Sequence, residues 1–138
     1  MANKIWFVVG LMSGTSLDGL DMAYVQIERA KNDYSYKLLL TKTLPYSKYW
    51  KNRLRSAFHS SSIEIEIINK EFGQYLGDIV RDFLDESSID NVDLIASHGH
   101  TVFHKPEEGF TLQIGDGHEL YEKVNIPVVY DFRTQDVA

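Results

Sequence analysis

The order of apolar and polar residues predicts three strands in the first third of the chain. Residues 5–9 are all apolar, and residues 22–27 form a second, largely apolar run. Such runs are typical of strands buried on both faces, and the small polar residues between them predict a tight turn. A further turn at 32–33 precedes residues 34–44, which have the character of a third strand. We therefore expect the chain to open with three antiparallel strands.

Helical spacing begins after residue 45. Ser47 precedes a short helical pattern, and Ser61 and Glu64 have the capping-box spacing that opens a longer one. Gly73 and Gly77 lie four residues apart in the longer pattern, which predicts close packing against a neighbouring element. The apolar residues expected on the buried faces are Trp50, Leu54 and Phe58 in the short helix and Ile68, Phe72, Leu76, Ile79 and Phe83 in the long one.

Short strands and turns are predicted again after residue 91. Apolar residues dominate 92–96, 111–114 and 127–130, and polar or glycine residues separate these segments. A short helix is expected at 117–124, with Asp116 in position to cap it. Strands that alternate with helices after an antiparallel start indicate a mixed α/β sheet.

Composition narrows the class of protein. The 138 residues are 43% hydrophobic and 25% charged, which is typical of a globular domain. A net charge of −6 argues against a nucleic-acid partner, which would require a basic surface. The chain has no cysteine, which excludes disulfides and thiolate metal sites and fits the cytoplasm. No stretch approaches the roughly 20 apolar residues of a membrane helix, so we expect no membrane contact.

The turn between the first two strands is the strongest candidate for ligand chemistry. Its glycines would let a backbone approach a ligand closely, and its hydroxyls can hydrogen-bond to one. Its carboxylates are hard oxygen ligands of the kind that hold magnesium, often through water. An Asp-Gly pair between two apolar runs is equally a signal for a hairpin that binds nothing. The residues concerned are Gly14, Thr15, Ser16, Asp18, Gly19 and Asp21.

Histidines gather in the second half of the chain, where four of the five lie within residues 98–118. In an extended segment His98, His100 and His104 would share one face, which makes a zinc site, and hence a zinc-dependent hydrolase, one interpretation. Hydrogen bonding to a polar substrate is the other, because residues that follow a buried strand commonly bind ligands in α/β sheets.

A third candidate follows the last predicted strand. Arg133 could clamp a carboxylate with its forked guanidinium group, or it could simply pair with Asp131 or Asp136.

Four motifs, in this order, closely resemble those of the anhydro-N-acetylmuramic acid kinases. They are residues 10–21 (GLMSGTSLDGLD), 97–104 (SHGHTVFH), 112–117 (LQIGDG) and 131–133 (DFR). The family belongs to the sugar kinase and actin-like ATPase superfamily, so the resemblance implies an actin-like ATPase (ribonuclease H-like) α/β fold. It also implies a bacterial cytoplasmic enzyme of peptidoglycan recycling. Such an enzyme uses ATP and Mg²⁺ to phosphorylate 1,6-anhydro-N-acetylmuramate at O6, while water opens the anhydro ring to give N-acetylmuramate 6-phosphate.

The resemblance also implies roles for particular residues. His98, Gly99 and Thr101 correspond to a motif near the sugar. Asp131 and Arg133 correspond to a motif expected to face the sugar, with Arg133 able to reach its lactyl carboxylate. The residues expected at the ATP phosphates are Gly14, Thr15, Ser16, Leu17, Asp18, Gly19, Leu20 and Asp21, of which Asp18 and Asp21 are the expected magnesium ligands, through water.

Two departures from the family pattern affect these assignments. Family members usually carry glutamine where this chain has His100. The chain also stops at Ala138, inside a motif that continues in the family into a glycine-rich segment, before the adenosine pocket and the general base. We therefore expect residues 1–138 to be the N-terminal part of the first actin-like ATPase lobe, inactive alone. A non-catalytic sugar- or nucleotide-binding lobe is the remaining alternative, and a homodimer is compatible with either.

Overall fold

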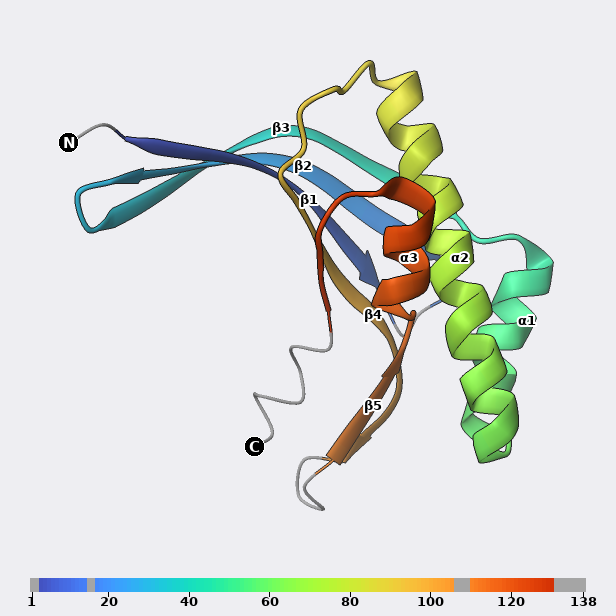
Figure 1. The fold of residues 1–138 in the computed structure, drawn as a ribbon. Helices are drawn as coiled ribbons and strands as arrows, with labels where there is room; N and C mark the ends of the chain where they lie inside the picture. Colours follow the sequence, from blue (N-terminus) through green and yellow to red (C-terminus); the bar gives the residue numbers. More distant parts are fainter. Residues whose placement is uncertain (1–2, 15–16, 106–109, 131–138) are drawn as a thin grey trace.

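The computed structural model describes residues 3–14, 17–105 and 110–130. Within these residues the chain is a mixed α/β fold, with three α-helices on one side of an open six-stranded sheet (Figure 1). The strand order is β3-β2-β1-β4-β5, and β6 is a further neighbour of β4. The predicted mixed α/β sheet is confirmed at this level.

The first three strands form an antiparallel meander, as the hydrophobic pattern predicts. β1 (Lys4–Ser13) pairs with β2 (Gly19–Ala30), and β2 pairs with β3 (Asp33–Pro45). Lys31 takes a left-handed conformation, with a φ of 60°, in the turn that joins β2 to β3. The sharp reversal at that turn lets two long strands pair along almost their whole length.

The later strands differ from the prediction in one respect. β4 (Leu94–Lys105) lies parallel to β1, β5 (Phe110–Ile114) is antiparallel to β4, and β6 (Val128–Val129) is parallel to β4. The predicted strand at 92–96 is too short, because β4 continues through the histidine-rich motif. Pairing with β5 supplies backbone hydrogen bonds to this polar half of β4, which has no apolar pattern of its own.

The three helices begin where the capping residues predict. They are α1 (Lys48–Ser56), α2 (Ser62–Glu86) and α3 (Gly117–Val124). In each case an oxygen of the preceding side chain accepts a hydrogen bond from a backbone amide of the first turn, which satisfies a donor that has no partner inside the helix. The capping residues are Ser47, Ser61 and Asp116.

The first helix is shorter than its apolar pattern suggests. α1 ends at Ser56 and is followed by a 3₁₀ turn, η1 (Ala57–His59). The change of helical period rotates Phe58 away from the face that buries Trp50 and Leu54, and its side chain is 51% exposed. The prediction that Phe58 lies on the buried face is therefore wrong.

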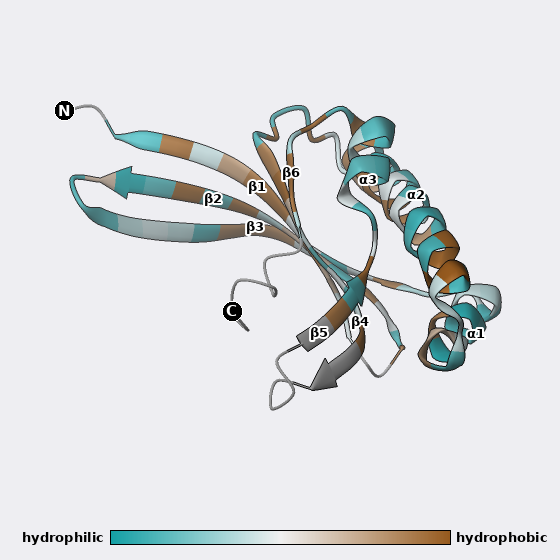
Figure 2. Cartoon of the chain, turned by 60° about the horizontal axis from the view of Figure 1, so that its bottom comes forward, coloured by the Kyte–Doolittle hydropathy of each residue, from teal (hydrophilic) through white to brown (hydrophobic). Residues whose placement is uncertain are grey.

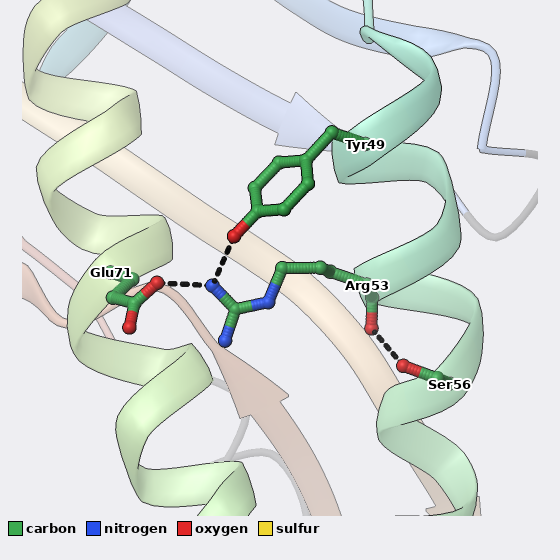
Figure 3. Close-up of polar contacts among 4 residues, drawn as sticks. All are labelled: Tyr49, Arg53, Ser56 and Glu71. Carbon is green, nitrogen blue, oxygen red and sulfur yellow. Dashed lines mark hydrogen bonds and ion pairs between the residues drawn. The ribbon is translucent and has the colours of Figure 1, made fainter.

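A polar cluster fastens α1 to α2 (Figure 3). The Arg53 guanidinium pairs with the Glu71 carboxylate and donates to the Tyr49 hydroxyl at 3.2 Å, while the Ser56 hydroxyl donates to the Arg53 carbonyl at 3.0 Å. Arg53 also lies over the Trp50 ring, 5.3 Å from its centre. This cluster holds the short helix in place against the long one.

The core lies between the sheet and α2. The five apolar residues predicted for the buried face of α2 are all buried, and Phe72 is completely so. Gly73 is in contact with the backbone of Asp116, and Gly77 with Lys123, so any side chain at either glycine would collide with the start or the end of α3. The predicted close packing at these two glycines is confirmed.

The other face of the sheet is not covered by a helix within the described residues (Figure 2). The register places apolar side chains there from several strands. They are Trp6, Val8 and Met12 of β1, Val25 and Ile27 of β2, Leu38 of β3 and Leu94 of β4. We call this surface the open face. None of the described helices is long and apolar enough to cross a membrane.

Candidate functional site

A backbone hydrogen bond and two packed leucines hold the turn between β1 and β2 in place. The Leu17 amide donates to the Gly14 carbonyl at 3.2 Å, and Leu17 adopts a φ of 62°. Leu17 packs against the core and Leu20 is 1% exposed, so these two leucines anchor the turn. Thr15 and Ser16 lie outside the described residues. The side chains of both leucines therefore contribute to packing.

Gly19 has a structural role that the sequence does not reveal. A Cβ atom at this position would collide with the backbone carbonyl of Leu44 in β3. The absence of a side chain thus allows β2 and β3 to begin pairing directly after the turn. Gly14, by contrast, is exposed at the other end of the turn, where a ligand could approach its backbone.

The two carboxylates of the turn both face solvent. Asp21 lies on the open face, where its carboxylate accepts a hydrogen bond from the Thr43 hydroxyl at 2.6 Å. Asp18 is exposed in the turn, directly before β2. These are oxygen donors free of a cationic partner among the described residues, a chemistry that suits a hydrated divalent cation.

Behind the turn lies a buried chain of hydrogen bonds. The Tyr46 hydroxyl donates to the Ser13 hydroxyl at 2.6 Å, and Ser13 Oγ lies 3.0 Å from His100 Nδ1. All three side chains are buried, and the His100 ring packs edge-on against Phe72. Burial raises the pKa of Tyr46 to about 12 and lowers that of His100 to about 4. At neutral pH both groups are therefore uncharged, and Ser13 can donate to the neutral imidazole.

Sequence reasoning missed this group. The signal that could have found it is the alternation of Val9, Leu11 and Ser13 along β1, which puts the serine on the buried face. A serine there needs a polar partner, since an unpaired hydroxyl in the core is costly. Because Ser13 is the last residue of β1, its two hydrogen bonds fix the point where the 14–18 turn leaves the sheet.

A bulge in β4 divides the histidines. Leu11 pairs with Ser97, but the next aligned pair is Ser13 with His100, so β4 uses one more residue than β1 over this interval. The extra residue is accommodated at Gly99, which takes a left-handed backbone conformation with a φ of 73°. The bulge turns His100 toward the helices and leaves His98 on the opposite side. The expectation that His98 and His100 share one face is therefore wrong.

The zinc interpretation required the histidines to share one face, and His98 and His100 do not. Where side chains are described, no group of three or more His, Asp or Glu residues is placed to hold a metal ion. The side chain of His104 lies outside the described residues. His98 instead lies beside the Gln113 amide, with N–N separations of 3.2 and 3.3 Å, and the same amide donates to the Thr101 hydroxyl at 3.3 Å.

The structure brings two of the predicted site residues together. Asp21 of β2 and His98 of β4 line one groove of about 450 Å³ on the open face. Met12 also lines it, from β1, the strand that lies between those two. Asp21 and His98, 77 residues apart in the sequence, are thus neighbours in space. This proximity follows from the parallel pairing of β1 with β4, whose carboxyl ends meet at the same edge of the sheet.

A cavity opens on the other side of the bulge. It has a volume of about 430 Å³ and is lined by residues of β4, β5 and the corner that follows β5, including Ser97, His98 and Gly99. The corner is fixed by Asn69 of α2, whose side chain accepts from the Gly115 amide at 2.8 Å. Asp131 and Arg133 lie outside the described residues.

Residues 6–138 match the sequence model of the family described as anhydro-N-acetylmuramic acid kinase. A kinase of that name from Bacillus cereus (strain AH187) is 35% identical over 142 residues, which cover 96% of this chain and 37% of that protein. Another, from Paramagnetospirillum magneticum (strain ATCC 700264 / AMB-1), is 38% identical over 132 residues, which cover 94% of this chain and 36% of that protein. The chain belongs to the anhydro-N-acetylmuramic acid kinase family, which confirms the resemblance, and it spans little more than a third of the length of these relatives.

Proposed function

We propose that residues 1–138 form the N-terminal part of the first lobe of an actin-like ATPase fold in an ATP-dependent sugar kinase. The proposed enzyme transfers the γ-phosphoryl group of ATP to O6 of 1,6-anhydro-N-acetylmuramate. In the same reaction water adds at C1 and the bond from C1 to O6 breaks, so the products are ADP and N-acetylmuramate 6-phosphate. The observation that carries the proposal is the family match over residues 6–138.

The turn between β1 and β2 is the proposed site of the ATP phosphates. Its support is geometric: an exposed Gly14 backbone, a start fixed by the buried Ser13, and two solvent-facing carboxylates. Asp18 and Asp21 would hold Mg²⁺ through water, and the bound ion would neutralise charge on the phosphates during transfer. The chemistry of the donors present therefore fits both groups.

The sugar is proposed to lie beside the β4 bulge. His98 and Gly99 line the cavity there, and Thr101 bonds to the same glutamine as His98. Asp131 and Arg133 are proposed to complete the sugar site, with Arg133 at the lactyl carboxylate. The shared groove of Asp21 and His98 supports this arrangement, because phosphoryl transfer requires phosphate and acceptor to be positioned together.

The general base that activates the attacking water is proposed to lie in the part of the enzyme beyond residue 138. Residues 1–138 alone should then form no sugar phosphate from ATP and 1,6-anhydro-N-acetylmuramate, since a general base must be within hydrogen-bond reach of its proton. We place the enzyme in the bacterial cytoplasm, where ATP is available.

The assignment can be tested with two variants of the complete enzyme. Asp18→Asn and Asp21→Asn should each lower turnover, by about 10²–10³-fold where a charge contact is lost, and at least one should change the dependence of the rate on magnesium. Asp33→Asn is a matched control, because Asp33 is an exposed carboxylate at the start of β3, beside the far end of β2. Wild-type rates and magnesium dependence in both variants would contradict the proposed phosphate site.

A further inference from the structure

The cavity beside the β4 bulge occupies a break in the pairing of that strand. β6 pairs with Ile95 and Ala96 of β4, whereas β5 pairs with β4 from His100 onward. Within the described residues, 97–99 pair with neither of these two strands. The cavity is therefore built into the sheet at the point where β5 and β6 diverge, which is the kind of place where α/β sheets bind ligands.

One residue that lines this cavity carries a buried hydroxyl group with no partner among the described residues. Ser97 is 1% exposed, and its Oγ makes no hydrogen bond to any described residue. Ser13 offers a direct comparison, because it is also a buried strand serine on the same face and its hydroxyl has two partners. Buried polar groups in proteins are almost always paired, so an orphan hydroxyl on a residue that lines a cavity points to a ligand.

The lining shows what kind of ligand group fits. The described lining residues include no lysine or arginine, and the polar groups they offer are a hydroxyl, carboxamides, an imidazole and a phenol. The single carboxylate, Asp116, is engaged in capping α3 through one oxygen at 2.8 and 3.2 Å from two backbone amides. Such a lining has no cation to balance the charge of phosphate or carboxylate, whereas it can hydrogen-bond to neutral hydroxyl and amide groups.

We propose that Ser97 binds substrate directly, by a hydrogen bond to the uncharged hydroxyl and acetamido side of the sugar. This inference rests on the proposed function and assigns the neutral and the charged parts of the sugar to different places. The neutral part of the sugar occupies the cavity at residues 97–99, and the lactyl carboxylate lies outside it. A volume of about 430 Å³ is within the range of small-ligand sites, which run from about 300 to 1,000 Å³.

The test compares the effects of one substitution on sugar affinity and on protein stability, which should not fall together. Ser97→Ala in the complete enzyme should weaken binding of 1,6-anhydro-N-acetylmuramate about three- to tenfold by calorimetry, the value of one hydrogen bond. The same substitution should leave the denaturation midpoint unchanged or raise it, because it removes a buried hydroxyl that has no partner. Ser13→Ala should lower the midpoint, because its hydroxyl is paired. Ser35→Ala, on an exposed part of β3, should change neither quantity.

A second probe tests the chemical class. 1,6-Anhydro-N-acetylglucosamine lacks the lactyl group, so Ser97→Ala should weaken its binding by the same factor. A loss confined to the lactyl-bearing sugar would overturn the neutral-side assignment. Unchanged affinity for both sugars would show that the hydroxyl is satisfied by water alone, and would overturn the proposal while the wild-type enzyme still phosphorylates its sugar. Failure of the wild-type enzyme to bind or phosphorylate the sugar would instead contradict the proposed function.

Discussion

The two faces of the sheet carry apolar residues of the same kinds but have different surroundings. On the covered face, Val9 and Leu11 of β1 are 0% and 4% exposed beneath the helices. On the open face, Met12 of β1 is 51% exposed and Leu38 of β3 is 56% exposed. One strand thus contributes to a packed core with one set of side chains and to a bare apolar surface with the other.

This difference shows that apolar runs and packing are separate properties. An uninterrupted run such as residues 5–9 is typical of a strand that is covered on both faces. The covered face also contains a paired polar group that is buried, formed by Ser13, Tyr46 and His100. We infer that the stability of residues 1–138 comes from the covered face, and that the open face contributes little in the isolated chain.

The largest effect is expected from deleting a ring of α2 that packs in the core above the covered face. Phe72 is 0% exposed and packs against Trp50, Tyr46 and His100, so Phe72→Ala should lower the free energy of unfolding by about 3–5 kcal/mol. Leu38→Ala, on the open face, should cost less than about 1 kcal/mol. Urea denaturation followed by circular dichroism measures both. Equal losses would break the distinction between the two faces.

Acid should lower the stability of the fold through a buried group on the covered face, His100. The folded-state pKa of His100 is about 4, below the ordinary value of 6.5, so its contribution to stability is complete above pH 6.5 and is lost as the pH falls from 6.5 toward 4. A difference of that size corresponds to about 3 kcal/mol. His100→Gln keeps an acceptor for Ser13 and cannot be protonated, so its stability should vary much less over that range.

His59→Gln is the matched control for the acid titration, because its ring is exposed on the 3₁₀ turn. Denaturation midpoints measured at half-unit steps of pH give the comparison. If His100→Gln loses stability with acid as steeply as the wild type, another group is responsible.

Local signals predicted the covered face well. Helix starts at Ser47, Ser61 and Asp116, and the buried positions of α2, all follow from caps and periodicity that are complete within a few residues. Phe58 was misplaced because a change from α to 3₁₀ geometry is set by packing, which periodicity does not record.

The candidate site was predicted less completely, since it depends on register between distant strands. Gly99 is compatible with a bulge but does not establish one, and the bulge alone decides that His98 and His100 face apart. The sequence likewise predicts that Ser13 and Ser97 lie in or beside strands, but only the fold shows that the Ser13 hydroxyl is paired and that the Ser97 hydroxyl has no partner among the described residues.

A smaller effect is expected from shortening the buried hydrogen-bond chain. Tyr46→Phe removes the hydroxyl that donates to Ser13 at 2.6 Å but keeps the ring against Phe72. The Ser13 hydroxyl retains its contact with His100, so the loss in unfolding free energy should be about 1–2 kcal/mol. Tyr49→Phe is the control, because that hydroxyl is exposed and bonds only to Arg53 among the described contacts. A similar loss in both variants would mean that the buried hydrogen bond of Tyr46 contributes no more to stability than the exposed one of Tyr49.

The smallest effect on stability is expected on the open face, from Leu38→Lys. A lysine at this position extends into solvent beside Val25, and surface substitutions of this kind usually change the free energy of unfolding by less than about 0.5 kcal/mol. The charge should at the same time reduce the binding of an apolar dye, because it interrupts an exposed apolar surface. Urea denaturation and dye fluorescence of residues 1–138 test the two expectations together. A loss of stability close to that of Phe72→Ala would show that this face is buried in solution against another copy of the chain, and the contrast between the two faces would then hold only for the isolated monomer.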